Sequence, residues 1–256
     1  MIDFFRKFKN TDKWRGPAIF FGENGYYTEA RPGSKEYTEY WAEQTDRCLY
    51  GYTADDGDFI TGFHYFYLNF CPILKMVYEE ITDRRTGNTR VVGNKEFGFP
   101  RFFDYDHYFF QYVEECIENG KFGAVAKARD RGYSYKMASM CNRNYFLKEQ
   151  SKSYIYVGDK RFLEGDGTMS KVFKIMDFID DNTAWSKSRV VDNKLHRRSG
   201  YRVKNKAGKT IETGYLSEII GMTLHNNPDG SRGVRGSLIF FEESGSFPRL
   251  LDAWQA

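Results

Sequence analysis

Hydrophobic and polar positions along the chain predict helices that alternate with strands. Apolar residues at helical spacing predict helices over Ser34–Tyr50, within Phe99–Asn119, over Lys136–Leu147, and after Asp166 through about Ile179. Short apolar runs predict strands over Thr61–Ile73, Ser153–Asp159, Glu218–Leu224 and Ser237–Phe241, and hairpin arms over Val77–Thr82 and Thr89–Val92. We therefore expect an α/β fold, with a mostly parallel sheet and helices on both of its faces.

The stretch Phe122–Met140 has the layout of a phosphate-binding loop. Gly123–Ala126 is small and apolar, which suits a short buried strand, and the chain then turns through Arg129–Gly132 before the helix. Ser134 stands at the start of that helix, where backbone N–H groups attract an anion. A hydroxyl at this position can bind the magnesium that accompanies a nucleotide.

Two positions depart from the standard G-x-x-x-x-G-K-[ST] loop. Ala126 stands where the first glycine would be, and Tyr133 stands where the lysine would be. The alternative interpretation is an ordinary strand-to-helix turn in which Gly132 supplies an unusual backbone angle.

The segment Ser237–Glu243 is an apolar run that ends in two carboxylates. A buried parallel strand has this pattern, and α/β sheets place their chemistry at the carboxyl ends of such strands. Glu242 is positioned to hold magnesium, directly or through water, and Glu243 can polarise the water that attacks a γ-phosphate. The alternative is a strand that ends in a solvated pair of glutamates.

The segment Lys127–Ser134 resembles the deviant Walker A loop of large terminase subunits, the DNA-packaging ATPases of tailed bacteriophages. In that family an arginine commonly sits three residues before the glycine, as Arg129 does, and some members carry the lysine near the start of the loop. Leu238–Gly245 is similar to the family's Walker B strand and catalytic glutamate. Arg232–Gly236 is similar to the Arg-Gly segment that often leads into that strand.

The resemblance extends from about Phe99 to the C-terminus, and Thr61–Ile73 is similar to the N-terminal lead-in of the family. It departs at Glu242, where the family usually has aspartate, and in ending at Ala256. Large terminases usually continue into a coupling segment and a nuclease domain. We therefore expect a fragment or a split gene product that does not cleave DNA.

The resemblance implies a P-loop NTPase core of the RecA-like, additional-strand catalytic-glutamate type in residues 99–256, behind an aromatic-rich extension with a β-hairpin in residues 1–98. It implies ATP hydrolysis, with ATP and Mg²⁺ as ligands, coupled to translocation of double-stranded DNA into a procapsid. The implied partners are a portal protein and a small terminase subunit, and the implied assembly is a homo-oligomeric ring in the host cytoplasm. Two alternatives stay open: another nucleic-acid-dependent P-loop motor, such as a helicase-like protein, and a degenerate nucleotide-binding or structural module without hydrolysis.

The residues and the resemblance together give three sets of site residues. Glu243 is the expected catalytic carboxylate, and either Arg129 or Lys127 is expected to replace the Walker lysine. Magnesium is assigned to Ser134 and Glu242. The residues expected to bind the nucleotide form the loop and the first turn of the helix: Lys127, Arg129, Asp130, Arg131, Gly132, Tyr133, Ser134 and Tyr135.

Composition narrows the class of protein without identifying a partner. A chain of 256 residues with 41% hydrophobic and 29% charged residues is typical of a soluble globular protein. The net charge of +3 is too small to imply a partner. The cysteines lack the C-x-x-C spacing of a zinc site, the four histidines are scattered, and no apolar run is long enough to span a membrane.

The local charge distribution is more informative, because the tract Lys187–Lys209 holds nine Lys/Arg residues and one acid, Asp192. A basic tract of this kind can follow the phosphate backbone of DNA. The alternative is a solvated hairpin that turns at Asn205–Gly208, since charge runs are often simply exposed.

Overall fold

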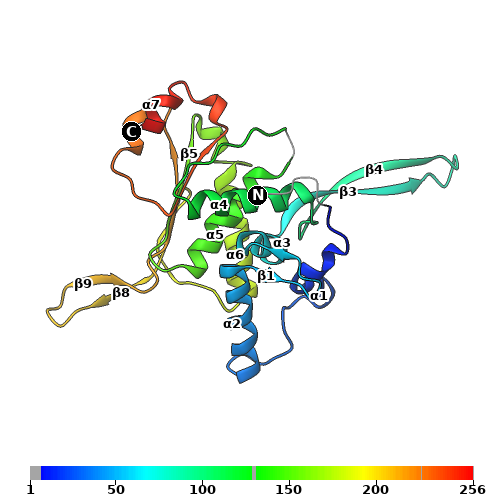
Figure 1. Cartoon of the computed structure of the whole chain (residues 1–256), viewed down its shortest axis with the longest axis horizontal. Coiled ribbons are helices and arrows are strands. Elements are labelled where there is room, and N and C mark those ends of the chain that lie inside the picture. Colours follow the sequence, from blue (N-terminus) through cyan, green and yellow to red (C-terminus); the bar gives the residue numbers. More distant parts are fainter. Residues whose placement is uncertain (1–6, 129–130, 226, 256) are drawn as a thin grey trace.

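The computed structural model describes residues 7–128, 131–225 and 227–255, and it has a mixed α/β fold (Figure 1). The α-helices formed by these residues are α1 (Gly16–Asn24), α2 (Lys35–Tyr50), α3 (Gly62–Phe70), α4 (Asp104–Glu118), α5 (Tyr133–Leu147), α6 (Thr168–Asn182) and α7 (Leu250–Gln255). The strands are β1 (Tyr52–Thr53), β2 (Phe59–Ile60), β3 (Ile73–Thr82), β4 (Thr89–Gly98), β5 (Lys152–Val157), β6 (Arg189–Asp192), β7 (His196–Ser199), β8 (Tyr201–Lys204), β9 (Thr210–Thr213), β10 (Glu218–Thr223) and β11 (Leu238–Glu242). Short 3₁₀ helices are η1 (Thr11–Trp14), η2 (Lys160–Phe162), η3 (Pro228–Ser231) and η4 (Ser244–Ser246). Among the described helices, none is both long and apolar enough to cross a membrane.

Five strands form the central sheet in the order β11-β5-β10-β7-β6. β5 runs parallel to both of its neighbours, β11 and β10, whereas β7 is antiparallel to β10 and to β6. The sheet is therefore mixed, which corrects the expectation of a mostly parallel sheet. The antiparallel part comes from a short turn in which Asn193 Oδ1 accepts hydrogen bonds from the backbone of Leu195 and His196. Such a turn joins neighbouring strands without the crossover helix that parallel pairing needs.

The two faces of the sheet are covered by different helices. Ile155 of β5 points into the main core, which α5 and α6 complete. Tyr154 and Tyr156 point to the opposite face, where they form a second cluster with Ala253 of α7. Helices thus lie on both faces, as expected (Figure 1). The strand β11 lies at the edge of the sheet, with Ile239 43% exposed, and is less buried than its apolar sequence predicts.

The segment Thr61–Ile73 is the clearest error of the sequence-based assignment, because it forms the helix α3 in place of a strand. Thr61 caps this helix, since its side chain accepts a hydrogen bond from the backbone N–H of His64 at 3.3 Å. All nine residues of α3 are buried. A helix that is buried on every side has no polar face, and its periodicity cannot be distinguished from that of a buried strand.

The segment Gly123–Ala126 does not form the expected strand. Residues 121–128 are exposed and have no regular secondary structure, and Phe122 is 84% exposed. Their backbone is held by a hydrogen bond from Ala124 N–H to the hydroxyl of Tyr112. Glycine has no side chain and alanine has only a methyl group, so this run buries little apolar area and gains little from pairing with a sheet.

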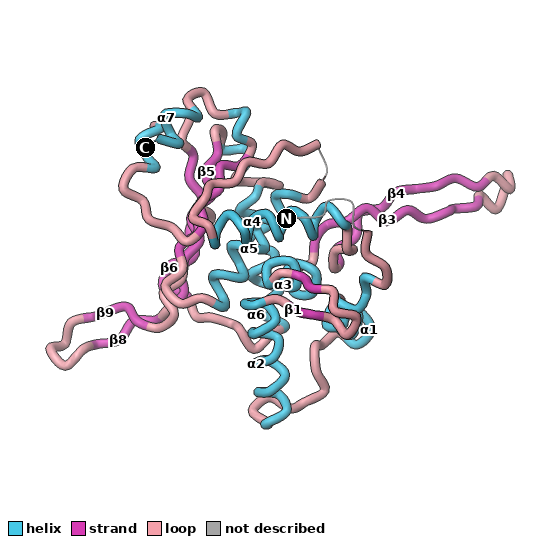
Figure 2. The backbone as a smooth tube through the Cα atoms, viewed as in Figure 1, coloured by secondary structure: helices cyan, strands magenta, loops and turns pink. Residues whose placement is uncertain are grey.

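Two hairpins project from the body of the molecule (Figure 2). The arms of the first, β3 and β4, were predicted at Val77–Thr82 and Thr89–Val92 and extend to ten residues each. The second, β8 with β9, turns at Asn205–Lys209 within the basic tract. The two hairpins point away from each other on opposite sides of the molecule.

The helix α5 lies at the centre of the fold, and every residue from Lys136 to Leu147 is buried. Arg143 donates hydrogen bonds to the carbonyls of Cys48 (2.8 Å) and Leu49 (2.7 Å) at the end of α2. Asn142 donates to the carbonyl of Val172 in α6 at 3.0 Å. The main core contains residues from both sides of the boundary predicted at 98/99, and α5 connects them.

Arg143→Met is expected to lower the free energy of unfolding by about 2–4 kcal/mol, because two buried carbonyls lose their charged donor. Urea titrations followed by tryptophan fluorescence measure this difference. Arg249→Met is the matched control: Arg249 pairs with Asp252 on the surface and is 65% exposed, so its loss should cost less than about 0.5 kcal/mol. Equal effects of the two substitutions would contradict the role given to Arg143.

Candidate functional site

The turn before α5 contains the glycine with an unusual backbone angle that the alternative interpretation of this segment describes, whereas the strand expected upstream is absent from residues 121–128. Gly132 is the N-cap residue and has φ 70°, in the left-handed region that favours glycine. A Cβ atom at this position would lie 3.7 Å from the hydroxyl of Tyr67, so the backbone angle and not crowding selects glycine. The carbonyl of Gly132 accepts hydrogen bonds from the backbone of Tyr135 and Lys136, which starts the helix immediately.

Ser134 and Glu242 lie in direct contact, although 108 residues separate them in the chain. The hydroxyl of Ser134 donates a hydrogen bond of 2.5 Å to Oε1 of Glu242, at the carboxyl end of β11. Glu242 is buried, with an exposed fraction of 4%. The first turn of α5 and the end of β11 therefore meet at one place, as the two sequence motifs predicted.

Glu243, the other acid of the pair, forms an ion pair with Lys127 at 3.1 Å. Its φ of 51° is left-handed, an uncommon conformation for a residue with a side chain, and it precedes η4. The turn is pressed against the end of β5, since a Cβ on Gly158 would lie 2.6 Å from the carbonyl oxygen of Ser246. This backbone turn separates the two carboxylates: Glu242 faces Ser134 and Glu243 faces Lys127.

A cleft of about 240 Å³ opens beside these contacts. Ser134, Glu242 and Glu243 line it on one side. The other lining residues come from η2, the loop after it and the start of α6: Arg161, Phe162, Asp166, Gly167, Thr168 and Lys171. The cleft is smaller than the roughly 300–1,000 Å³ of typical small-molecule sites, so it suits one polar portion of a ligand.

Lys171 is one of the six lining residues that were not among the site residues predicted from the sequence. It lies one turn into α6, and its Nζ is 5.6 Å from the ring centre of Tyr135. Burial lowers the pKa of Lys171, against the effect of Glu242 and Asp166, whose carboxylates favour its charged form. The signal available in the sequence was the Asp166–Thr168 segment before a helix, which could have indicated a second chain segment at the site.

Several of the residues expected to bind a nucleotide face other parts of the fold. The guanidinium of Arg131 lies 5.8 Å from the ring of Tyr105, and Tyr133 packs edge-on against Phe109. The hydroxyl of Tyr135 accepts a hydrogen bond from the backbone of Leu74. The predictions for Arg129 and Asp130 fall outside the described residues.

A buried ion pair lies behind the first turn of α5. Lys136 and Asp106 of α4 pair with each other and are almost fully buried. Burial raises the pKa of Asp106 to about 6, although Lys136 favours its ionised form, and burial also lowers the pKa of Lys136. The Nζ of Lys136 lies 4.1 Å from the ring centre of Tyr133, so the buried pair contacts the first turn of α5.

The donor set at the cleft fits magnesium. The described residues contain no cluster of three or more His, Cys, Asp or Glu side chains that could hold a metal alone. A hydroxyl and a carboxylate, Ser134 and Glu242, meet instead, and both are hard oxygen donors. Mg²⁺ commonly keeps several waters and takes one or two protein oxygens together with substrate phosphates, so two ligands are sufficient.

Comparisons with protein-family models and with curated proteins find no match to this chain.

The Asp106–Lys136 pair predicts a dependence of stability on pH. The folded carboxyl binds a proton near pH 6, and an unfolded aspartate does so near pH 4, so the folded state holds more protons between these values. The contribution of Asp106 to the free energy of unfolding should therefore rise as the pH falls from about 6 to about 4. Asp106→Asn removes this contribution. The free energy of unfolding of the wild type minus that of the variant should therefore increase as the pH falls from about 6 to about 4.

Urea titrations at several pH values measure the difference. A constant offset of Asp106→Asn from wild type across these pH values would show that Asp106 does not titrate in this window.

Proposed function

We propose that this chain is the ATPase part of a large terminase subunit, which couples ATP hydrolysis to translocation of double-stranded DNA into a procapsid. The observation that carries the proposal is the contact of Ser134 with Glu242. It joins the two motifs on which the resemblance rests. The proposed partners are a portal protein and a small terminase subunit, within a homo-oligomeric ring in the host cytoplasm.

The triphosphate of ATP is proposed to occupy the cleft. No side chain among the described residues caps the start of α5 at Gly132, so the backbone N–H groups of Tyr133 and Ser134 are proposed to bind an anion. Lys171 and Arg161 add positive charge on the opposite wall. Mg²⁺, held by Ser134 and Glu242, would neutralise charge on the phosphate oxygens.

Glu243 is proposed to orient the attacking water and to accept its proton. It is 45% exposed on its side chain, so water reaches it, and Lys127 holds it beside the cleft. Glu242 is engaged by Ser134 and would hold the metal together with it, which leaves the water to Glu243. The two carboxylates therefore have separate roles that follow from the turn between them.

Nucleotide binding without hydrolysis is the second candidate, and one observation favours it. Residues 121–128 lie outside the sheet, so the loop before Gly132 lacks the strand that would anchor its upstream side. Lys127, one of the two candidates for the missing Walker lysine, is engaged with Glu243. Release of phosphate from ATP distinguishes the two candidates.

Glu243→Gln is expected to reduce ATP hydrolysis by at least about a hundredfold and to leave nucleotide affinity within a few-fold of wild type, because a general base acts as the reaction proceeds. Single-turnover phosphate release measures hydrolysis, and titration with a fluorescent ATP analogue measures binding. Glu164→Gln is the control, since Glu164 pairs with Lys160 at the same 3.1 Å outside the cleft lining. Wild-type turnover in Glu243→Gln would remove Glu243 from the catalytic role.

Lys171→Met is expected to weaken nucleotide binding and to reduce hydrolysis by about 10²–10³-fold, because a half-buried cation would stabilise charge on the γ-phosphate. Lys171→Arg should restore part of the activity. Lys174→Met is the control, because Lys174 lies about one turn further along α6 and is exposed. This substitution should change nucleotide affinity and the rate of hydrolysis by less than about twofold. Equal behaviour of the two methionine variants would place Lys171 outside the site.

A further inference from the structure

We propose that the β8–β9 hairpin binds the phosphate backbone of double-stranded DNA through Lys204, Lys206 and Lys209. The identity of the duplex as DNA rests on the proposed function. The assignment of the contact to this hairpin rests on how the fold distributes the charges of the basic tract Lys187–Lys209.

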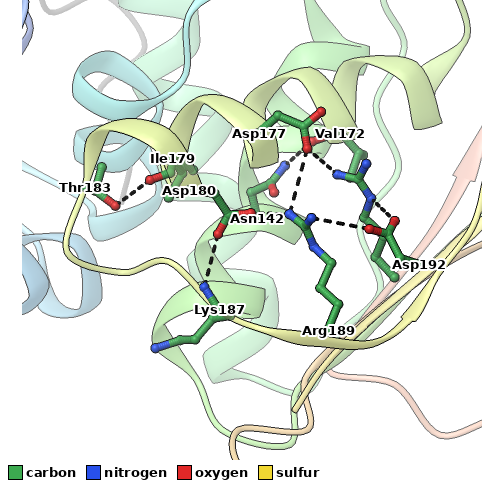
Figure 3. A network of polar contacts seen from close by, with 10 residues as sticks. Asn142, Val172, Asp177, Ile179, Asp180, Thr183, Lys187, Arg189 and Asp192 are labelled. Atoms are coloured by element: carbon green, nitrogen blue, oxygen red, sulfur yellow. Dashed lines mark hydrogen bonds and ion pairs between the residues drawn. The ribbon is translucent and has the colours of Figure 1, made fainter. Parts of the chain in front are cut away.

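The arginines of the tract form ion pairs with carboxylates of the same chain. Arg189 forms ion pairs with Asp177, Asp180 and Asp192, and Figure 3 shows it among these carboxylates beside α6. Arg197 pairs with Asp177 at 2.6 Å and with Asp192 at 2.8 Å. These contacts fasten the β6–β7 edge of the sheet to α6 and leave little charge for a ligand.

The two remaining arginines share one acid. Glu212 of β9 accepts Arg198 at 2.9 Å and Arg202 at 3.2 Å. One carboxylate between two guanidinium groups leaves a net positive charge at the base of the hairpin. The arginines of the tract are thus paired with carboxylates at the sheet, whereas the charge at the base of the hairpin is only partly balanced.

The lysines of the hairpin have no such partners. Within the part of the chain that the structure describes, Lys204, Lys206 and Lys209 form no ion pair, and all three are exposed. Lys204 ends β8, and the other two lie in the turn and just before β9. Three like charges held close together repel one another, so an anionic partner of matching spacing would be bound favourably.

The turn that carries these lysines is well defined. The side chain of Asn205 accepts hydrogen bonds from the backbone of Ala207 (3.0 Å) and Lys209 (2.9 Å). Gly208 has φ 75°, which the tight turn requires. The lysines are therefore presented by a fixed scaffold, and fewer degrees of freedom are lost when they contact a partner.

The shape of the hairpin suits a duplex. It is a two-stranded ribbon with arms of four residues that projects from the body of the molecule, opposite β3–β4 (Figure 1). The major groove of B-DNA, about 12 Å wide, admits a two-stranded β-ribbon, and lysines at its edges reach the flanking phosphates. Contacts with phosphates do not depend on the base sequence, and a motor that moves along DNA needs contacts of this kind.

The β3–β4 hairpin provides the comparison within the same molecule. It also projects from the body of the molecule, but its arginines Arg84, Arg85 and Arg90 are interspersed with Glu79, Glu80 and Asp83. Its charges nearly cancel, so it should not attract a duplex. Substitution of its three arginines removes the same formal charge from another projecting hairpin.

The test is binding of a fluorescent 30-base-pair DNA duplex of arbitrary sequence, measured by anisotropy without nucleotide at several salt concentrations. The triple variant Lys204→Gln, Lys206→Gln, Lys209→Gln should bind about 10- to 100-fold more weakly at low salt. The slope of log affinity against log salt should fall by about 2 to 3, because each phosphate contact contributes about 0.9. The control Arg84→Gln, Arg85→Gln, Arg90→Gln should retain wild-type affinity and slope.

Three results would overturn the inference: no duplex binding by the wild type at low salt, unchanged binding by the lysine variant, or an equal loss in the arginine control. Unchanged binding by the lysine variant would place the contact with the duplex on another part of the molecule. Circular dichroism and urea titration confirm that each variant is folded. Because nucleotide is absent from the assay, failure of ATP hydrolysis counts against the proposed function and leaves the hairpin result intact.

Discussion

The burial of α5 is the constraint on which the rest of the structure depends. A helix that is buried on every side offers its polar side chains no solvent, so each must find a partner on a neighbouring element. Arg143 reaches the end of α2, Asn142 reaches α6, and Lys136 reaches α4. These links fix the direction of the helix axis and place its first turn, with Ser134, against the end of β11.

The sequence predicted the two halves of the site because their signals are local. A glycine and a hydroxyl at a helix start, and an apolar run that ends in acids, each depend on a few consecutive residues. Their meeting, Ser134 against Glu242, follows from the rule that α/β sheets gather polar groups at the carboxyl ends of their strands. The helices α2, α4, α5 and α6 were predicted for the same reason, since each has a stripe or a cap that one segment reveals.

The features that the sequence did not predict depend on packing between distant segments. Thr61–Ile73 was assigned as a strand because a helix enclosed by the core has no polar face to mark its period. Lys171 was not predicted, because the Asp166–Thr168 segment before its helix indicates only a helix start and does not show that the start of α6 faces β11. Gly123–Ala126 was assigned as a strand from its small residues alone, and whether such a run pairs depends on the area that its neighbours can bury.

The charges at the cleft explain how it remains compact while keeping the groups that the proposed reaction needs. Among the described residues at the cleft, three acids (Asp166, Glu242 and Glu243) face three cations (Lys127, Arg161 and Lys171), so their formal charges cancel. A magnesium triphosphate brings both signs, with phosphate oxygens for the cations and a divalent ion for Glu242. Binding can then exchange one set of contacts for another at little net electrostatic cost.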